Sequence, residues 1–136
     1  MHILIPSALQ RFVDLFNRAA YWESHEVLER PWRTGRSDFY KGLILYASAW
    51  VHVQRGNPRG IAAQLRKAER QLEAFRPAYL GVDVDALLAH AAVALQTVLE
   101  HEGAAWHKWE AVLPAPRLEL RAERIRGNEA ELAEGE

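Results

Sequence analysis

The chain has 136 residues, a formal net charge of −1 and no cysteine. A chain of this length forms one domain with its own core, and the lack of cysteine excludes disulfides and thiolate metal sites. The balanced charge argues against nucleic acid or a membrane surface as a partner, and no apolar stretch approaches the ~20 residues that span a bilayer. Residues 1–6 have neither a basic leader nor a small-residue cleavage site, so we expect no signal peptide and a cytoplasmic protein.

Two short helices are predicted at the start of the chain, on either side of a junction at 17–20. Ser7 is expected to cap the first helix, whose apolar stripe has helical spacing. The second is expected from Tyr21 to about Arg30, because Pro31 lacks a backbone donor and disfavours helical geometry in the residue before it. The apolar stripe of the first helix consists of Leu9, Phe12, Val13 and Phe16.

The third predicted helix, about 39–55, is the most apolar segment of the chain. The turn 34–37 precedes it, and Ser37 or Asp38 is expected to cap it. Its polar side chains fall within about 40° of one another on a helical wheel. We therefore expect this helix to be buried on nearly every face but one and to lie at the centre of the fold. The polar side chains are those of Lys41, Ser48 and His52.

Two further helices are predicted after the Gly56-Asn57-Pro58 sequence, which ends one helix and caps the next. The fourth helix is expected to run to about Phe75, since Pro77 cannot continue it. Asp83 is expected to cap a fifth helix that ends near Glu102. The residues predicted to face inward from this last helix are Leu87, Leu88, Ala91, Leu95, Val98 and Leu99.

The apolar periodicity weakens after Gly103. Trp106 and Trp109 are predicted to anchor a tail, 103–136, against the body of the protein, and the end from Gly127 is expected to fray. The sequence as a whole predicts a single all-α domain over 1–136. We expect an irregular bundle of about five helices with its core at about 7–102 and an extended C-terminal tail.

The second predicted helix carries the sharpest grouping of polar residues. On a helical wheel Tyr21 and Leu28 define the apolar face and Trp22 flanks it. His25 and Glu29, four residues apart, fall between them and are expected to be enclosed by aromatic and aliphatic neighbours. The charge of a histidine beside a carboxylate is tuned in such surroundings, as in many active sites. Two further acids are predicted to point toward solvent: Glu23 and Glu26.

The pair formed by His25 and Glu29 has two interpretations. It can be a structural hydrogen bond or ion pair that braces the second helix against the third. It can also belong to a metal site, because His25-Glu26-x-x-Glu29 is similar to the His-Glu-x-x-His zinc helix with Glu29 in place of the second histidine. The third ligand would then be His52, although His52 near its helix C-terminus can also simply face water.

Other residue groups favour packing over chemistry. The aromatic residues of the central region are typical of a core rather than of a ligand pocket. The basic residues near the end alternate with glutamates, which predicts a mixed, solvated surface and no nucleic acid. No glycine-rich phosphate loop is present, and we expect no cofactor. The aromatic group is Trp32, Trp50, Phe39, Tyr40 and Tyr46, and the basic group is Arg117, Arg121, Arg124 and Arg126.

Several short motifs occur in a fixed order between residues 12 and 75. They are Phe16-Asn17, Tyr21-Trp22-Glu23-x-His25-Glu26-x-Leu28-Glu29-x-x-Trp32, Phe39-x-x-Gly42-Leu43-Ile44-x-x-Ala47 followed by His52, and Gly56-Asn57-x-x-Gly60-x-x-x-x-Leu65. In these the chain resembles domain-of-unknown-function family 309, small bacterial all-helical proteins with an HExxE-type motif. The resemblance implies an irregular helical bundle with no assigned activity. The family's recurrent polar positions correspond here to Glu23, His25, Glu26, Glu29, His52 and Asn57.

Two positions depart from the family pattern. The residue two before Tyr21 is commonly glycine in the family and is Ala19 here, so the junction is expected to be more helical. The residue after Ile44 is often glutamine and is Leu45 here, which removes a polar group one turn before Ser48.

The sequence alone does not establish an activity. The favoured interpretation is a non-enzymatic interaction or self-association module, with an unidentified partner or a second copy, in which the polar cluster is structural. The alternative is a metal-assisted hydrolase or another small-molecule enzyme that uses His25, Glu29 and His52, with Glu29 or Glu26 as the base.

Overall fold

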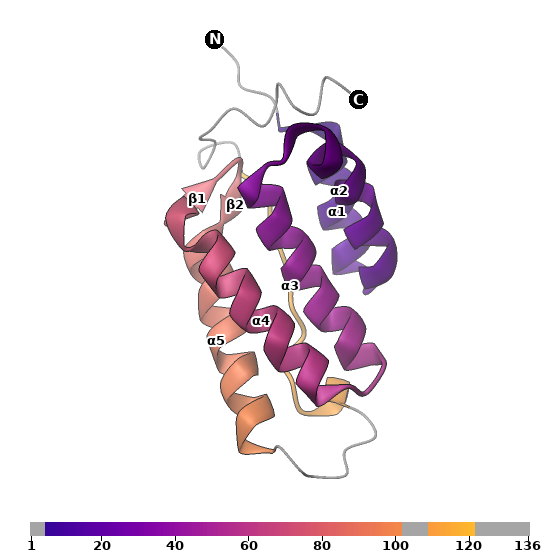
Figure 1. Cartoon of the computed structure of the whole chain (residues 1–136), viewed down its shortest axis with the longest axis vertical. Coiled ribbons are helices and arrows are strands. Elements are labelled where there is room, and N and C mark those ends of the chain that lie inside the picture. The colour runs from indigo at the N-terminus through magenta and orange to yellow at the C-terminus, as the bar shows by residue number, and fades with distance from the viewer. Residues whose placement is uncertain (1–4, 102–108, 122–136) are drawn as a thin grey trace.

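Helices account for most of the chain in a computed structural model that describes residues 5–101 and 109–121 (Figure 1). The α-helices are α1 (Ser7–Asn17), α2 (Tyr21–Gly35), α3 (Asp38–Gln54), α4 (Pro58–Leu72) and α5 (Val84–Glu100). The short elements are the 3₁₀ turns η1 (Glu73–Phe75) and η2 (Trp109–Ala111) and the strands β1 (Ala78–Tyr79) and β2 (Val82–Asp83). The predicted all-α bundle is confirmed.

Three predicted helix caps are present as hydrogen bonds from backbone N–H groups to side-chain oxygens. Ser37 accepts from the Tyr40 amide at 3.1 Å, Asn57 from Gly60 at 3.1 Å and Asp83 from Ala86 at 2.9 Å. The predicted Ser7 cap is wrong. Pro6, with extended backbone, occupies the N-cap position of α1 and Ser7 is already helical, without a side-chain cap bond.

The end of α2 also differs from the prediction, because the helix continues through Pro31 to Gly35. Pro31 is buried, and the Arg36 amide donates to the Trp32 carbonyl at the helix end. Apolar packing thus offsets the hydrogen bond that proline cannot make. The helix stops where Arg36 takes a left-handed φ of 56°.

The junction between α1 and α2 is a turn, so the expectation of more helix at Ala19 is wrong. Ala19 has a left-handed φ of 63°, and the Ala20 amide donates to the Leu15 carbonyl at 2.9 Å. Glycine adopts this conformation without steric cost. The family resemblance implies glycine at this position, and the left-handed φ of Ala19 gives a physical reason for it.

A hairpin that the sequence analysis missed follows α4. The predicted fourth helix ends at Leu72 rather than Phe75, because η1 tightens its last turn. β1 then pairs antiparallel with β2, across a turn in which Leu80 and Gly81 both have positive φ. Two residues of this kind suit the short turns of β-hairpins.

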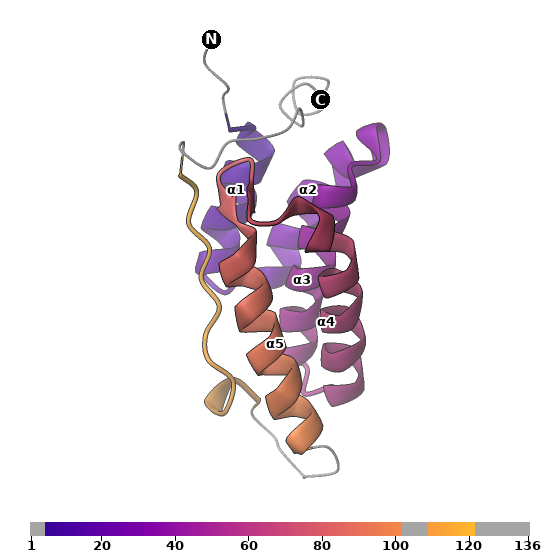
Figure 2. The same ribbon diagram turned by 90° about the vertical axis from the view of Figure 1, so that its left-hand side faces the viewer.

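α3 lies between the other helices, with α2 and α1 on one side and α4 and α5 on the other (Figures 1 and 2). Its polar stripe is half-buried, whereas most of the remaining helix is buried, as expected. Phe16 stacks on Tyr46 with ring centroids 5.5 Å apart, which joins α1 to α3 in the core. No helix of the described residues is long and apolar enough to cross a membrane.

The part of the tail that the structure describes, 109–121, runs back along the bundle between α1 and α5 (Figure 2). Trp109 is buried, as predicted for an anchor. Asn17 exchanges two hydrogen bonds with the backbone of Leu118, at 2.7 and 2.9 Å. Trp106 and the end from Gly127 lie outside the described residues.

One inward-facing prediction on α5 is wrong. Leu99 is 41% exposed, whereas Leu87, Leu88 and Val98 are buried. Leu99 lies in the last turn of α5, and it lines a cavity instead of filling the core.

Candidate functional site

α2 brings His25 and Glu29 together, as predicted from their spacing. His25 Nε2 lies 2.8 Å from Glu29 Oε1, and the Arg33 guanidinium donates to Glu29 Oε2 at 2.7 Å. The side chains of His25 and Glu29 are 15% and 29% exposed, so the pair is half-buried. His25 Nδ1 lies 3.2 Å from the Trp22 carbonyl oxygen. Both ring nitrogens therefore face acceptor oxygens, and the carboxylate is shared with Arg33.

Trp22 projects beside this pair and is 46% exposed. Its ring lies 5.0 Å from the His25 ring, and the Arg55 guanidinium lies 5.4 Å from its centre. Arg55 follows the C-terminus of α3, so Trp22 spans the junction of two helices. The remaining two acids of the motif, Glu23 and Glu26, are exposed, as expected.

His52 belongs to a different arrangement at the turn between α3 and α4. The Asn57 amide donates to His52 Nδ1 at 3.2 Å, while its oxygen caps α4. A Cβ at Gly60 would lie 2.4 Å from His52 Nδ1, so only glycine lets the ring pack here. Burial, together with the charge of Arg55, lowers the pKa of His52. The ring is packed between helices instead of simply facing water.

The six polar residues singled out from the sequence thus form two groups instead of one. Within the described residues, no hydrogen bond or ion pair joins His52 or Asn57 to His25 or Glu29. The described part of the chain also contains no group of three His, Cys, Asp or Glu side chains that could hold a metal ion. The hypothetical set of His25, Glu29 and His52 is therefore not assembled.

A second histidine network, which the sequence analysis missed, connects α3, α5 and the tail. His90 Nε2 donates to the Pro114 carbonyl at 3.0 Å, because that oxygen can only accept. His90 Nδ1 then accepts from the Tyr46 hydroxyl at 2.9 Å. Burial lowers the pKa of His90 and raises that of Tyr46. His90 lies on the inward stripe of α5 three residues after Leu87, and this spacing could have identified it.

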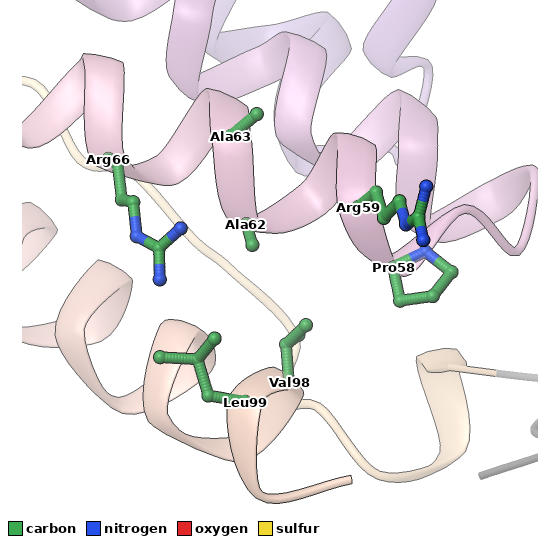
Figure 3. A pocket seen from close by; sticks show the side chains of 7 residues that line it. All are labelled: Pro58, Arg59, Ala62, Ala63, Arg66, Val98 and Leu99. Carbon is green, nitrogen blue, oxygen red and sulfur yellow. The ribbon is translucent and has the colours of Figure 1, made fainter. Parts of the chain in front are cut away.

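Two surface cavities lie on the sides of α4. One, of about 490 Å³, separates α4 from α5, with Ala62 facing Val98 and Leu99, and Arg59 and Arg66 at its two ends (Figure 3). The other, of about 350 Å³, lies between α3 and α4. It is lined by Lys41, Leu45, Lys67, Arg70 and Gln71.

A third, smaller cavity of about 160 Å³ lies where the tail covers the start of α2. It is lined in part by Tyr21, Trp50 and Glu110. Burial, with the nearby charge of Glu110, raises the pKa of Tyr21. Four members of the aromatic group are buried in the core, as expected, namely Phe39, Tyr40, Tyr46 and Trp50.

The basic residues near the C-terminus show mixed charge where the structure describes them. Arg121 forms an ion pair with Glu119 at 3.0 Å, and Arg117 is exposed. Arg124 and Arg126 lie outside the described residues.

Comparison with known proteins identifies one family. Residues 9–64 match the family described as "Domain of unknown function (DUF309)". The match includes α2, α3 and the start of α4, and so both groups of polar residues. No curated protein matches the chain.

Proposed function

Residues 9–64 match the DUF309 family, and from this starting point we propose that the chain is a non-enzymatic self-association module. The interface we propose is the exposed ridge of α2, a helix within the part of the chain that matches the family. The ridge consists of Trp22, Glu23, Glu26, Arg30 and Arg33, all of which are exposed.

Charge is ordered along the α2 ridge, and this observation carries the proposal. Glu23 and Glu26 come first, and Arg30 and Arg33 follow one and two turns later. The spacings of three and four residues place all four on one face of the helix. α2 packs against α1 and α3, which leaves this face outside the bundle.

The order of charges makes the α2 ridge complementary to itself when two copies meet antiparallel. A two-fold axis perpendicular to α2, at the level of residue 28 along the helix, places Glu26 opposite Arg30 of the second copy, and Glu23 opposite Arg33. Both pairs form at the same time because residues 26 and 30 and residues 23 and 33 are centred on the same position of the helix. A two-fold interface presents the same patch on both subunits, so self-complementarity of this kind is what it requires. Parallel pairing would instead place like charges together.

Trp22 supplies apolar area at each end of such an interface. Large aromatic side chains with a fixed orientation dominate the energetics of many protein–protein contacts. The His25 ring and Arg55 flank Trp22 and restrict its orientation. The pair of His25 and Glu29 then has a positioning role behind the ridge, which agrees with a structural polar cluster.

A metal-assisted hydrolase is not supported by the arrangement of the same residues. Glu29, the candidate base, is shared between His25 and Arg33. His52 is bonded to Asn57 and packed on Gly60. We therefore assign no catalytic residue.

The proposal is tested by the molar mass of the full chain in solution over a range of concentrations, with charge-reversed variants. Glu26→Arg and Arg30→Glu each place like charges opposite one another, and we expect each to weaken the dimer at least tenfold. An equimolar mixture of the two variants should restore association, because one ridge is then basic and the other acidic. Arg11→Glu is the matched control, since Arg11 is exposed on α1.

Two results would contradict this function. The first is a wild-type chain that remains a monomer at several hundred micromolar. The second is association that resists both reversals and Trp22→Ala, since the interface would then lie elsewhere on the surface.

A further inference from the structure

The cavity between α3 and α4 has an unusual charge. Three of its five lining residues are cations, namely Lys41 from α3 and Lys67 and Arg70 from α4, and none is an acid. Leu45 and Gln71 complete the lining. The net charge of the chain is −1, so this concentration of positive charge is local.

The three cations have no ion-pair partners within residues 5–101 and 109–121. Lys67 and Arg70 are three residues apart on one face of α4, and like charges at this spacing destabilise a helix. Lys41 adds a third positive charge from the facing helix. An anion held among them would offset this repulsion.

The positions of two polar groups in the cavity are fixed by neighbours. The Lys41 ammonium lies 4.6 Å from the centre of the Trp32 ring, a cation–π contact that restrains the side chain without neutralising it. Gln71 donates from Nε2 to the Asp38 carboxylate at 3.1 Å, which fixes its side-chain amide. The five lining residues therefore contribute three positive charges and no negative one.

We propose that this cavity binds the phosphate groups of a small molecule. The guanidinium of Arg70 presents a planar fork of donors suited to phosphate oxygens, and the two lysines act as compact point charges. A volume of about 350 Å³ exceeds the space that a single phosphate needs and suits a diphosphate or a phosphorylated metabolite.

The cavity between α4 and α5 provides the contrast within the same molecule. It is lined by two arginines, Arg59 and Arg66, but the rest of its lining is apolar (Figure 3). Arg66 adjoins Lys67 in the sequence and faces the other side of α4. Neutral substitution of Arg66 or of Lys67 changes the net charge of the chain by the same amount. The first alters only the cavity between α4 and α5, and the second alters only the cavity between α3 and α4.

Titration calorimetry of the full chain with inorganic pyrophosphate at low ionic strength tests the proposal. We expect saturable binding with one site per chain. Lys67→Gln and Arg70→Gln should each weaken it about tenfold, since each removes a charge-assisted contact. Arg66→Gln, the matched control, should change the affinity less than twofold. Orthophosphate is expected to bind more weakly, and the unfolding temperature of each variant confirms that it is folded.

Three results would overturn the proposal: no saturable binding of pyrophosphate at millimolar concentration, equal weakening by Arg66→Gln, or citrate bound as tightly as pyrophosphate. Equal weakening would indicate general attraction of anions to the surface. Tight citrate binding would indicate a site for carboxylates. None of these results bears on association through α2, which uses other residues.

Discussion

Two histidine networks in the described part of the chain, those of His25 and His90, differ in the sequence distance that they connect. His25 bonds within α2, to a glutamate four residues away, and its side chain stays in partial contact with solvent. His90 bonds to Tyr46 on α3 and to Pro114 in the tail, 44 and 24 residues away in sequence. The first network fixes the surface of one helix, and the second holds three segments together.

The difference between these networks shows where a polar group contributes most to stability. The ion pairs of Glu29 lie within one helix and stay in partial contact with water, which competes for the partners, so we expect them to contribute little. A buried hydroxyl that loses its partner costs more, because water cannot replace the bond. Tyr46 is 1% exposed, and Glu29 keeps Arg33 as a second partner. We therefore expect the His90 network to matter more for folding, although its sequence context is less conspicuous.

Removal of His90 should have the largest effect. His90→Ala deletes two hydrogen bonds and leaves the Tyr46 hydroxyl buried without its acceptor, so we expect a loss of about 2–4 kcal/mol in the free energy of unfolding. Urea denaturation measures this loss. Tyr46→Phe in the His90→Ala background removes the orphaned hydroxyl and should recover part of it. A loss of a few tenths of a kcal/mol would mean that the network is not formed in solution.

Mild acid should weaken the same network to a smaller extent. Burial holds the pKa of His90 in the folded chain below its ordinary value of 6.5. At a pH between the folded pKa and 6.5, the unfolded chain therefore binds a proton at His90 that the folded chain does not. Stability is therefore complete above about pH 6.5 and falls as the pH drops through the folded pKa. A protonated ring can no longer accept from Tyr46, whereas its bond to Pro114 survives.

The unfolding temperature measured between pH 7.5 and 5 checks this dependence. His90→Gln should flatten the profile, and His52, whose pKa is also lowered, should account for part of the remaining slope. Asp83, Arg117 and Glu119 line a cavity together with His90 and form its charged surroundings. An unchanged slope in His90→Gln would show that His90 does not titrate in this range.

Local features were predicted from the sequence where the evidence lies within a few residues. The caps at Ser37, Asn57 and Asp83 each depend on one side chain and an amide three residues later. The burial of α3 on most of its faces follows from its nearly continuous apolar sequence. Pro31 was misjudged because its local cost is outweighed by tertiary packing, which the sequence of α2 does not contain.

The candidate site was predicted only where it depends on residues close together in the sequence. The bond between His25 and Glu29 follows from a spacing of four residues. The separation of His52 from that pair depends on how α3 packs on α4, where the ring lies against Gly60. The cationic cavity needs Lys41 and Lys67 on facing helices, 26 residues apart, and no local pattern predicts that approach.

Removal of the His25 side chain should have the smallest effect on the free energy of unfolding, in contrast to removal of His90. His25→Ala should cost only about 0.3–1 kcal/mol in urea denaturation, because Glu29 keeps its bond to Arg33 and can also be hydrated. The double variant His25→Ala/Arg33→Ala should cost more than the sum of the single variants, since Glu29 then loses both partners. Strict additivity would mean that the two bonds to Glu29 are independent. A loss comparable to that of His90→Ala would contradict the distinction between a surface network and a core network.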